Sequence, residues 1–476
     1  MNLLRRTRPR WLWVVLLIVL FAHAAAAQVQ APALLLPDAR YKADVLLIVA
    51  HPDDDVVIGG YLARVSLDQR KRIAVIYCTD GDGGGNSVGN ESGAALGLVR
   101  EMEARRALGF LGIENVWFLK GHDTPGQNVL RSLDRWNHGL ALDEVMQLVR
   151  ITRPEVILTW LPDPVVGENH DDHQASSVLA TEAFDMAGDP TWFPEQVSPP
   201  HDRTGMENLT EGLLPWQAKK LYFFTDAFED FGPYWHEAAN LSPYRRNFLA
   251  GNGPSYENKD ISPARHESYA QLNAEQQVFY QTQEGDIGDQ AVKNHDFSGF
   301  AYPMRLILGK SLVGGSATGD VFEGVSSSPA PFVRVRGYEP ATKTGLSLEI
   351  GDPWRFYSLF WKAHDLDRMG ALIPVPEMDA SGSELLNVPL LACNQTGDAA
   401  EIAITSSLPA GWTDHTPYMR YPVRAGECYP IQARIGVSAA DKAHWSEITW
   451  TASTGSQRAG SVKVRVFVGR SGGLPQ

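Results

Sequence analysis

Short apolar runs alternate with amphipathic segments between residues 44 and 160. Four runs rich in β-branched residues have the length of buried strands: 44–50, 73–78, 116–119 and 156–160. Between them, residues 96–111 and 140–151 place apolar side chains at helical spacing and end at Gly112 and before Pro154. Strands that alternate with helices predict a parallel sheet with crossover helices, so we expect a Rossmann-like α/β domain.

The C-terminal part of the chain has a different hydrophobic pattern. From about residue 384 onward, apolar and polar residues alternate over short segments, and no helix of ordinary length fits. The candidate strands are 388–392, 400–405, 431–437, 446–452 and 461–468. We therefore expect an all-β sandwich over residues 384–470. The segment 408–412 (LPAGW) resembles the fibronectin-like sandwiches that follow secreted glycosidases, which leaves a carbohydrate-binding domain and a structural spacer as equal alternatives.

A chain of 476 residues exceeds the size at which a single hydrophobic core usually stops growing, so more than one domain is expected. The patterns divide it into an α/β domain at 40–315, a linker or irregular β region at 316–383 and the sandwich at 384–470. The first 27 residues form a separate segment.

This N-terminal segment has the order of a secretory signal peptide. Four arginines precede the apolar run 11–21, and alanines dominate the residues just before Gln28. The run is shorter than the roughly 20 residues of a membrane span. We therefore expect cleavage before Gln28 and a periplasmic or extracellular protein, with an uncleaved membrane anchor as the alternative.

Charge and cysteine content exclude two classes of protein. The formal net charge is −14, and cleavage would remove four arginines and no acidic residue, which leaves −18. So acidic a chain is not expected to bind nucleic acid. Three cysteines are too few for a disulfide-built scaffold. Cys78 lies in an apolar run and is expected to be a buried thiol, whereas Cys393 and Cys428 either pair after export or stay free.

The first candidate site, residues 51–55 (HPDDD), directly follows the apolar run 44–50. Pro52 disfavours the α conformation at His51, so the imidazole should project from the strand end, and the proline would itself start the next helix. Asp53 and Asp54 would then lie in the first helical turn, where free N–H groups favour carboxylates. A helix cap with surplus acids is the alternative for this segment alone.

The second candidate site, residues 169–173 (NHDDH), follows the strand 156–160 across a loop with Pro and Gly. Two histidines beside carboxylates supply the nitrogen and oxygen ligands that zinc binds. A histidine pair on a loop is by itself more often exposed to solvent. Because the carboxyl ends of parallel strands meet at one edge of a sheet, the two segments together predict a metal site at that edge.

These segments resemble the PIG-L/LmbE-like family of zinc-dependent N-acetylglucosaminyl deacetylases. The resemblance covers about residues 43–310 and rests on both metal motifs, on TDGDGGG at 79–85, on LVREMEARRALGFLGI at 98–113 and on FLKGHD at 118–123. It implies a Rossmann-like fold and removal of the acetyl group from an N-acetylated sugar or glycoconjugate. It also implies one Zn²⁺ per chain, or another divalent metal in its place.

Position by position, the resemblance implies a set of site residues. The implied zinc ligands are His51, Asp54 and His173. Asp53 matches the general base, and His170 matches the histidine that stabilises the oxyanion or protonates the departing amine. Asp172 matches the acid that orients this histidine.

Two further residues match the family, and two depart from it. Arg100 and Asp123 match positions near the acetyl group and the sugar hydroxyls. Asp55 stands where the family usually has Glu, and Asp171 stands where it usually has Pro. Neither change removes a ligand, so activity is still expected. The extra charge of Asp171 is expected to raise the pKa of His170.

The chemistry of amide hydrolysis gives these residues their roles. Zinc with three protein ligands keeps a position for water, whose pKa falls to about 7. Asp53 would take the proton, His170 would stabilise the negative charge on the acetyl oxygen, and either His170 or protonated Asp53 would protonate the amine. The glycine-rich stretch 81–89 lacks the lysine of a phosphate loop and is expected to be a flexible rim of the site.

Two other functions remain open. One is an exported carbohydrate-binding protein with an inactive deacetylase fold, which could contact cell-envelope glycans through the C-terminal sandwich. The other is an amide hydrolase with the same mechanism and a substrate that is not a sugar. The wall of the substrate pocket is expected in the divergent segment 189–294, where the sequence carries no motif.

Overall fold

The computed structural model describes residues 38–124, 126, 128–162, 170–197, 213–226, 253–330, 332, 344–363, 366, 368, 375–380, 385–416, 419–438 and 443–469. The signal peptide expected at 1–27 and about a third of the region 316–383 lie outside these described residues. None of the helices in the described ranges is both long and apolar enough to cross a membrane.

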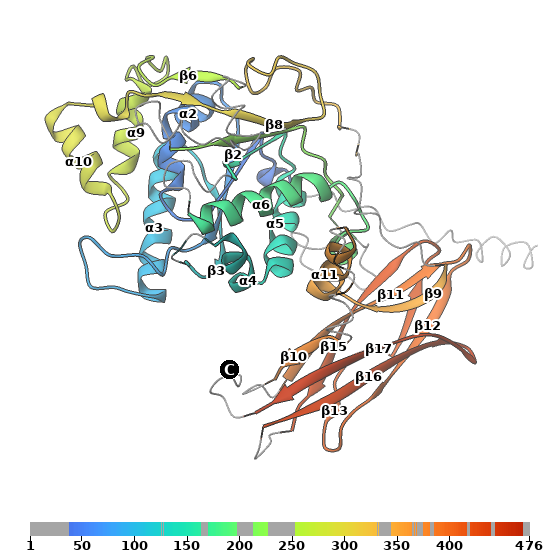
Figure 1. The fold of residues 1–476 in the computed structure, drawn as a ribbon. Coiled ribbons are helices and arrows are strands. Elements are labelled where there is room, and N and C mark those ends of the chain that lie inside the picture. The colour runs from blue at the N-terminus through green and yellow to red at the C-terminus, as the bar shows by residue number, and fades with distance from the viewer. Residues whose placement is uncertain are drawn as a thin grey trace, which may run out of the picture. The chain divides into compact units, whose positions relative to one another are not determined.

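A six-stranded sheet forms the centre of the α/β region (Figure 1), in the order β3-β2-β1-β4-β5-β8. Its strands are β1 (Val45–Val49), β2 (Ile73–Thr79), β3 (Asn115–Gly121), β4 (Val156–Trp160), β5 (Lys220–Phe224) and β8 (Ile307–Ser311). The first five pair in parallel, and β8 pairs antiparallel with β5. The predicted α/β class with a parallel sheet is therefore confirmed. The order in which the chain adds strands reverses between β1 and β4.

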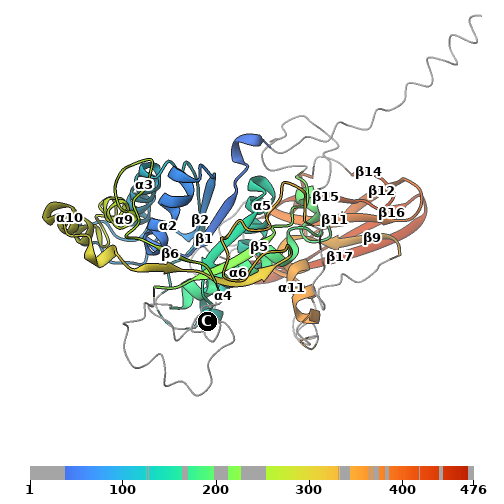
Figure 2. The same ribbon diagram turned by 90° about the horizontal axis from the view of Figure 1, so that it is seen from above.

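Helices cover both faces of this sheet (Figure 2). The helices α2 (Gly59–Ala63), α3 (Ala94–Phe110) and α9 (Tyr269–Gln277) contribute to one core, and α4 (Val129–Arg135), α5 (His138–Thr152) and α6 (Asp171–Met186) contribute to the other. Along β1, Leu46 and Ile48 enter the core with α5, while Val45, Leu47 and Val49 enter the core with α3. Since both faces of each central strand are buried, these strands are continuous apolar runs in the sequence.

Shorter elements complete the α/β region. They are η1 (Ala39–Tyr41), η2 (Asp54–Ile58), η3 (Arg64–Asp68), α7 (Pro194–Val197), β6 (Ser255–Glu257), α10 (Gly285–Asn294), η5 (Ser298–Phe300) and β7 (Pro303–Arg305). One expectation needs correction here, because the helical segment after His51 begins at Asp54 and not at Pro52. Asp53 precedes it with φ 121°, so this residue does not lie in a helical turn.

Two further sheets lie toward the C-terminus, in the orders β10-β17-β16-β12-β14 and β13-β15-β11-β9. Their strands are β9 (Gly345–Ile350), β10 (Glu377–Asp379), β11 (Leu385–Gln395), β12 (Ala400–Ser407), β13 (Thr413–Asp414), β14 (Arg420–Val423), β15 (Cys428–Gly436), β16 (His444–Thr454) and β17 (Gln457–Val468). One cluster of buried residues draws on both sheets and includes Trp412. A strand-rich C-terminal region is thus present, and its fibronectin-like sandwich topology stays a prediction.

The region expected to be a linker or irregular β region, 316–383, contains a regular strand and a helix. β9 precedes the expected boundary at residue 384, yet it pairs antiparallel with β11. The helix α11 (Asp352–Ala363) follows β9 directly, and its Phe360 ring packs edge-on against His138 of α5. The domain boundaries themselves stay a prediction.

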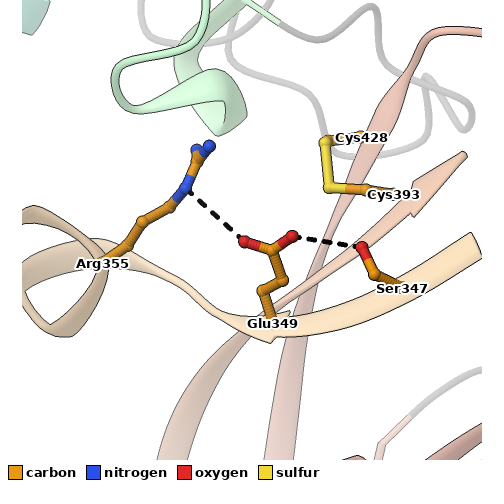
Figure 3. The surroundings of a disulfide bond; sticks show 5 residues. All are labelled: Ser347, Glu349, Arg355, Cys393 and Cys428. Atoms are coloured by element: carbon orange, nitrogen blue, oxygen red, sulfur yellow. Dashed lines mark hydrogen bonds and ion pairs between the residues drawn. A yellow bond between two sulfur atoms is a disulfide. The ribbon is translucent and has the colours of Figure 1, made fainter. Parts of the chain in front are cut away.

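A disulfide joins Cys393 and Cys428, which face each other on the antiparallel strands β11 and β15. Figure 3 shows its surroundings, where Ser347 donates a hydrogen bond to Glu349, whose carboxylate also lies 3.9 Å from Arg355 of α11. The sequence left open whether Cys393 and Cys428 pair or stay free, and in the structure they pair. Cys78 is buried and unbonded to another cysteine, as expected.

Candidate functional site

The two candidate motifs meet at the point where strand order reverses. His51 follows the end of β1, and α6 begins at Asp171 in the chain segment after the neighbouring strand β4. Ligands of open α/β sheets bind in the crevice at such a reversal, beyond the carboxyl ends of the strands. The sheet topology therefore brings the residues of both motifs to one edge.

Asp54 is held in one orientation by three N–H donors. The backbone amides of Ala50 and His51 donate to its Oδ2 atom at 2.8 and 3.0 Å, and Trp160 Nε1 donates to the same oxygen at 2.8 Å. Its other oxygen, Oδ1, lies 3.0 Å from Nε2 of His173. Burial alone would raise the pKa of Asp54, but the adjacent imidazoles of His173 and His51 hold it well below its ordinary value.

The three expected zinc ligands present their donor atoms to one another. His51 Nδ1 lies 3.3 Å from His173 Nε2 and 3.6 Å from Asp54 Oδ1, and the third separation is the 3.0 Å contact between Asp54 and His173. A tetrahedral zinc ion with bonds of about 2.0–2.1 Å holds its ligand atoms roughly 3.3–3.4 Å apart. The donor set His51, Asp54 and His173 therefore fits zinc in chemistry and in spacing.

The second nitrogen of His51 faces carboxylates. His51 Nε2 lies 3.4 Å from Asp172 Oδ2 and 3.5 Å from Asp123 Oδ1. Asp172 Oδ2 also accepts the backbone N–H of Thr124 at 2.7 Å. Metal-binding histidines commonly donate their other ring N–H to a carboxylate, which fixes the tautomer and leaves the first nitrogen for the metal.

Two other sets of three side chains could also hold a metal ion, because the donor atoms within each set lie within 4.8 Å of one another. The first set is His51, His170 and His173, and the second is His51, Asp123 and Asp172. The second group uses the far nitrogen of His51 and a carboxylate oxygen that already accepts an amide N–H. The first group omits Asp54, although Asp54 Oδ1 lies 3.6 Å from His51 Nδ1 and 3.0 Å from His173 Nε2. We therefore favour His51, Asp54 and His173.

Asp53 lies beside the ligands and lines a cavity of about 440 Å³ that opens from them. Its φ of 121° is a conformation that residues with a Cβ rarely adopt, and such backbone strain is often found at functional sites. Burial, reinforced by the negative charge of Asp54, raises the pKa of Asp53 well above its ordinary value.

His170 caps α6 and stacks on His173, with ring centroids 4.0 Å apart. Its Nδ1 atom lies 3.4 Å from Asp171 Oδ1, so the structure places Asp171 beside His170 and the Asp172 carboxylate beside His51. Burial, followed by the charges of His173 and His51, lowers the pKa of His170 to about 4. The net pKa of His170 is thus lowered, and a raising contribution from Asp171 stays a prediction.

Arg100 and Asp123 both line the cavity, as expected for residues near a substrate. Arg100 Nη1 donates to Gly81 O, and Arg100 Nη2 donates to Gly85 O, each at 2.8 Å. Gly81 has φ +73°, and a Cβ there would lie 2.7 Å from the guanidinium, so glycine is favoured at this position. Arg100 thus holds the glycine-rich loop against the site.

Asp55 is fully buried and has a structural role that its motif did not reveal. Its Oδ1 atom accepts hydrogen bonds from Tyr77 at 2.7 Å and from Tyr280 at 2.6 Å, and Gln276 donates to Oδ2. These contacts tie the chain segment that carries Asp53 and Asp54 to β2 and to the end of α9.

The far wall of the cavity is the part that the motifs missed. It is built from α9, α10, η5 and the residues between them, and includes Gln277, Tyr280, Ile287, Phe300 and Tyr302. Part of this wall lies within the expected segment 189–294, while the two residues around η5 lie beyond it. Their only signal in the sequence is an aromatic residue at three of the five positions.

Comparison with known proteins agrees with the motifs. The family described as PIG-L, GlcNAc-PI de-N-acetylase, matches residues 46–184. The 1D-myo-inositol 2-acetamido-2-deoxy-alpha-D-glucopyranoside deacetylase 1 of Frankia alni is 28% identical over 189 residues, which are 36% of this chain and 59% of that protein. The diacetylchitobiose deacetylase of Thermococcus kodakarensis is 31% identical over 152 residues, which are 31% of this chain and 51% of that protein.

The chain thus spans little more than half the length of these curated relatives. Among solved structures, the N,N'-diacetylchitobiose deacetylase of Pyrococcus horikoshii aligns with 68% of this chain and 98% of its own at 16% identity, with a TM-score of 0.33 that supports no inference. The residues 46–184 that match the PIG-L family contain both candidate metal motifs.

Proposed function

We propose that this chain is a zinc-dependent hydrolase that removes the acetyl group from an N-acetylated amino sugar or its glycoconjugate and releases acetate. The observation that carries the proposal is the mutual spacing of the donor atoms of His51, Asp54 and His173, at 3.0 to 3.6 Å, beside the cavity that Asp53 lines. The named activities of the relatives, which are deacetylases of acetamido sugars, support the same reaction.

The residues at the site have different roles in the proposed amide hydrolysis. Bound zinc would supply a Lewis acid and lower the pKa of its water toward neutrality. Asp53 takes the proton from the attacking water, because it lines the cavity without belonging to the ligand set. His170 stabilises the charge that develops on the acetyl oxygen. The amine receives its proton from His170 or from Asp53.

Other residues keep this arrangement in place. Asp172 holds the far nitrogen of His51 and thereby orients the ring toward Asp54 and His173. Asp123 and Arg100 line the cavity at the same end and are the proposed contacts to the substrate. The aromatic wall from Tyr280 to Tyr302 would exclude water from the bound sugar.

The proposed enzyme works outside the cytoplasm, as the arginine, apolar and alanine order of residues 5–27 suggests. A glycan contact through the C-terminal sheets and a spacer role remain alternatives. Trp412 does not support the glycan contact, because its side chain is part of the core between the strands.

An acetate-release assay tests the proposal. The purified protein would be offered N-acetylglucosamine, its oligomers, N-acetylglucosaminyl lipids and simple N-acetyl amides, while its metal content is measured in parallel. We expect acetate from one or more of the sugars and none after chelation of the metal. Acetate from the simple amides alone would favour an amide hydrolase for other substrates, and sugar binding without acetate would favour an inactive binding protein.

A further inference from the structure

We propose that residues 276–283, which are the end of α9 and the turn after it, act through Asp55 to hold Asp53 in place for catalysis. We call these residues the α9 turn. Asp55 is then a positioning residue, because it acts on the reaction through its neighbour in the chain. This inference rests on the proposed function, in which Asp53 is the general base.

The α9 turn holds the chain on both sides of Asp53. On the C-terminal side, Tyr280 donates a hydrogen bond to Asp55 Oδ1 at 2.6 Å. On the N-terminal side, Gln283 Nε2 donates to the carbonyl oxygen of Pro52. Asp55 and Pro52 are both buried, so water does not readily replace these bonds. Between the two fixed points, Asp53 has its strained φ of 121°.

The α9 turn is itself fixed by other parts of the domain. Thr282 donates its backbone N–H and its hydroxyl to the carboxylate of Glu103 on α3, at 2.9 and 2.7 Å. Ser87 of the glycine-rich stretch donates its backbone N–H to Thr282 O and its hydroxyl to Gln283 O, each at 3.0 Å. A segment that positions a catalytic group must be rigid, and these bonds supply that rigidity.

Close packing between α2 and α9 brings a further donor to Asp55. Gly59 is the first residue of α2, and a Cβ there would lie 2.0 Å from Asn273 Oδ1 and 2.3 Å from Gln276 Oε1. Both amide side chains are buried. A methyl group at Gly59 would displace them, so glycine permits the packing in which Gln276 Nε2 donates to Asp55 Oδ2.

The proposed metal ligand in this segment does not depend on the α9 turn. Asp54 Oδ2 accepts hydrogen bonds from two backbone amides of its own motif and from Trp160. Asp55 does not belong to the described lining of the cavity. Loss of the bonds to Asp55 should therefore displace Asp53 and lower kcat, with little change in zinc content or in KM.

Two substitutions of Asp55 separate hydrogen bonding from charge. Asp55→Ala leaves three donors without their acceptor, and we expect kcat to fall by about 100-fold, as for a misplacement of roughly 1 Å. Asp55→Asn keeps an oxygen for both tyrosines. The amide of Gln276 can then turn, because its Oε1 has no hydrogen-bond partner within the described part of the chain and can accept the new N–H. We expect Asp55→Asn to recover most of the lost kcat.

These rates would be measured on the zinc-loaded full chain, with the N-acetyl sugar that the wild type hydrolyses fastest in the acetate-release assay. KM and zinc content should match the wild type in both variants. Equal losses of kcat in Asp55→Ala and Asp55→Asn would assign the effect to the negative charge and overturn positioning by hydrogen bonds.

A pair of tyrosine variants makes a milder test. Tyr280→Phe keeps the ring on the cavity wall but removes one donor to Asp55, and kcat should fall by about 10-fold. Tyr269→Phe is the matched control, because Tyr269 begins the same helix and donates to Asp68 at the same 2.6 Å, away from the described cavity lining. Its kcat should equal that of the wild type. Equal losses of kcat in the two variants would mean that the bonds matter only for stability.

Hydrogen exchange, measured by mass spectrometry, tests the same inference without turnover. The backbone N–H groups of Asp54 and Val56 donate to His51 O and Asp53 O. In zinc-loaded Asp55→Ala these amides should exchange faster than in the wild type, while the amides of α5 keep their rate. Faster exchange throughout the chain, or an unchanged rate in this segment, would overturn the inference.

The outcomes separate this inference from the proposed function. Acetate release by Asp55→Ala at the wild-type kcat would overturn the positioning role and leave the deacetylase intact. Release from none of the sugars by the wild type would contradict the proposed function instead. The exchange rates then still decide whether Asp55 holds the segment that carries Asp53.

Discussion

His173 Nε2 lies 3.0 Å from Asp54 Oδ1, although 119 residues separate them in the chain. The contact exists because β1 and β4 are neighbours in the sheet while the chain passes through β2 and β3 between them. Each motif needs the other to complete the proposed ligand set, so the parallel sheet brings two short acidic segments together into one candidate metal site.

Loss of any ligand should release the metal. We expect His51→Ala, Asp54→Ala and His173→Ala each to contain much less than one zinc per chain after dialysis, since two remaining ligands cannot hold it. Elemental analysis of the purified variants measures this. His122→Ala is the control, because its side chain is 70% exposed and lies outside the ligand trio, and full occupancy in all three ligand variants would refute the assignment.

Trp160 should affect the affinity for zinc without being a zinc ligand. In Trp160→Phe an aromatic ring still faces His173, but Asp54 Oδ2 loses the hydrogen bond from the indole N–H. We expect zinc affinity to fall by about 10-fold to 100-fold, the usual effect of removing a hydrogen bond that orients a ligand. Trp136→Phe is the matched control, because that indole donates to His122 O instead. Competition with a zinc chelator measures the affinity, and unchanged binding in Trp160→Phe would show that the indole has no such role.

The Cys393–Cys428 disulfide should stabilise the C-terminal sheets and leave the metal site alone. Its two cysteines are 35 residues apart, and closing a loop of this size is worth about 2–4 kcal/mol of unfolding free energy. In calorimetry, the C-terminal sheets of the Cys393→Ser/Cys428→Ser variant should unfold at a lower temperature than those of the wild type. The zinc content of the variant should stay at the wild-type level. Identical unfolding of variant and wild type would mean that the bond adds no stability.

Export should leave a mature chain that begins close to Gln28. Four arginines, an apolar run and a stretch of alanines precede this residue. N-terminal sequencing of protein from the periplasm or medium would check the prediction. Recovery of the chain with Met1 from a soluble cytoplasmic fraction would rule it out.

The sequence was informative where the physical cause is local. The parallel strands β1, β2, β4 and β5 are buried on both faces and therefore read as unbroken apolar runs. The histidines and aspartates of the two motifs could be paired because the ends of parallel strands meet at one edge of a sheet.

The features that were missed depend on contacts between distant segments. Tyr280 donates to Asp55 across 225 residues, and neither residue type nor spacing links the two. The positive φ of Asp53 is likewise set by its surroundings, since the sequence favoured a helical turn there. The residues of β9 fall in the segment expected to be a linker or irregular β region, and only the pairing of β9 with β11 shows that it belongs to the C-terminal sheets.

The proposed hydrolysis depends most directly on Asp53, which lines the cavity next to the proposed ligands without being one of them. Acetate release from an N-acetyl sugar would be compared between the wild type and Asp53→Asn at matched zinc content. We predict that the variant keeps its zinc and binds the sugar while turnover falls by about 100-fold to 10,000-fold, the usual effect of removing a general base. Turnover by Asp53→Asn at close to the wild-type rate would contradict it.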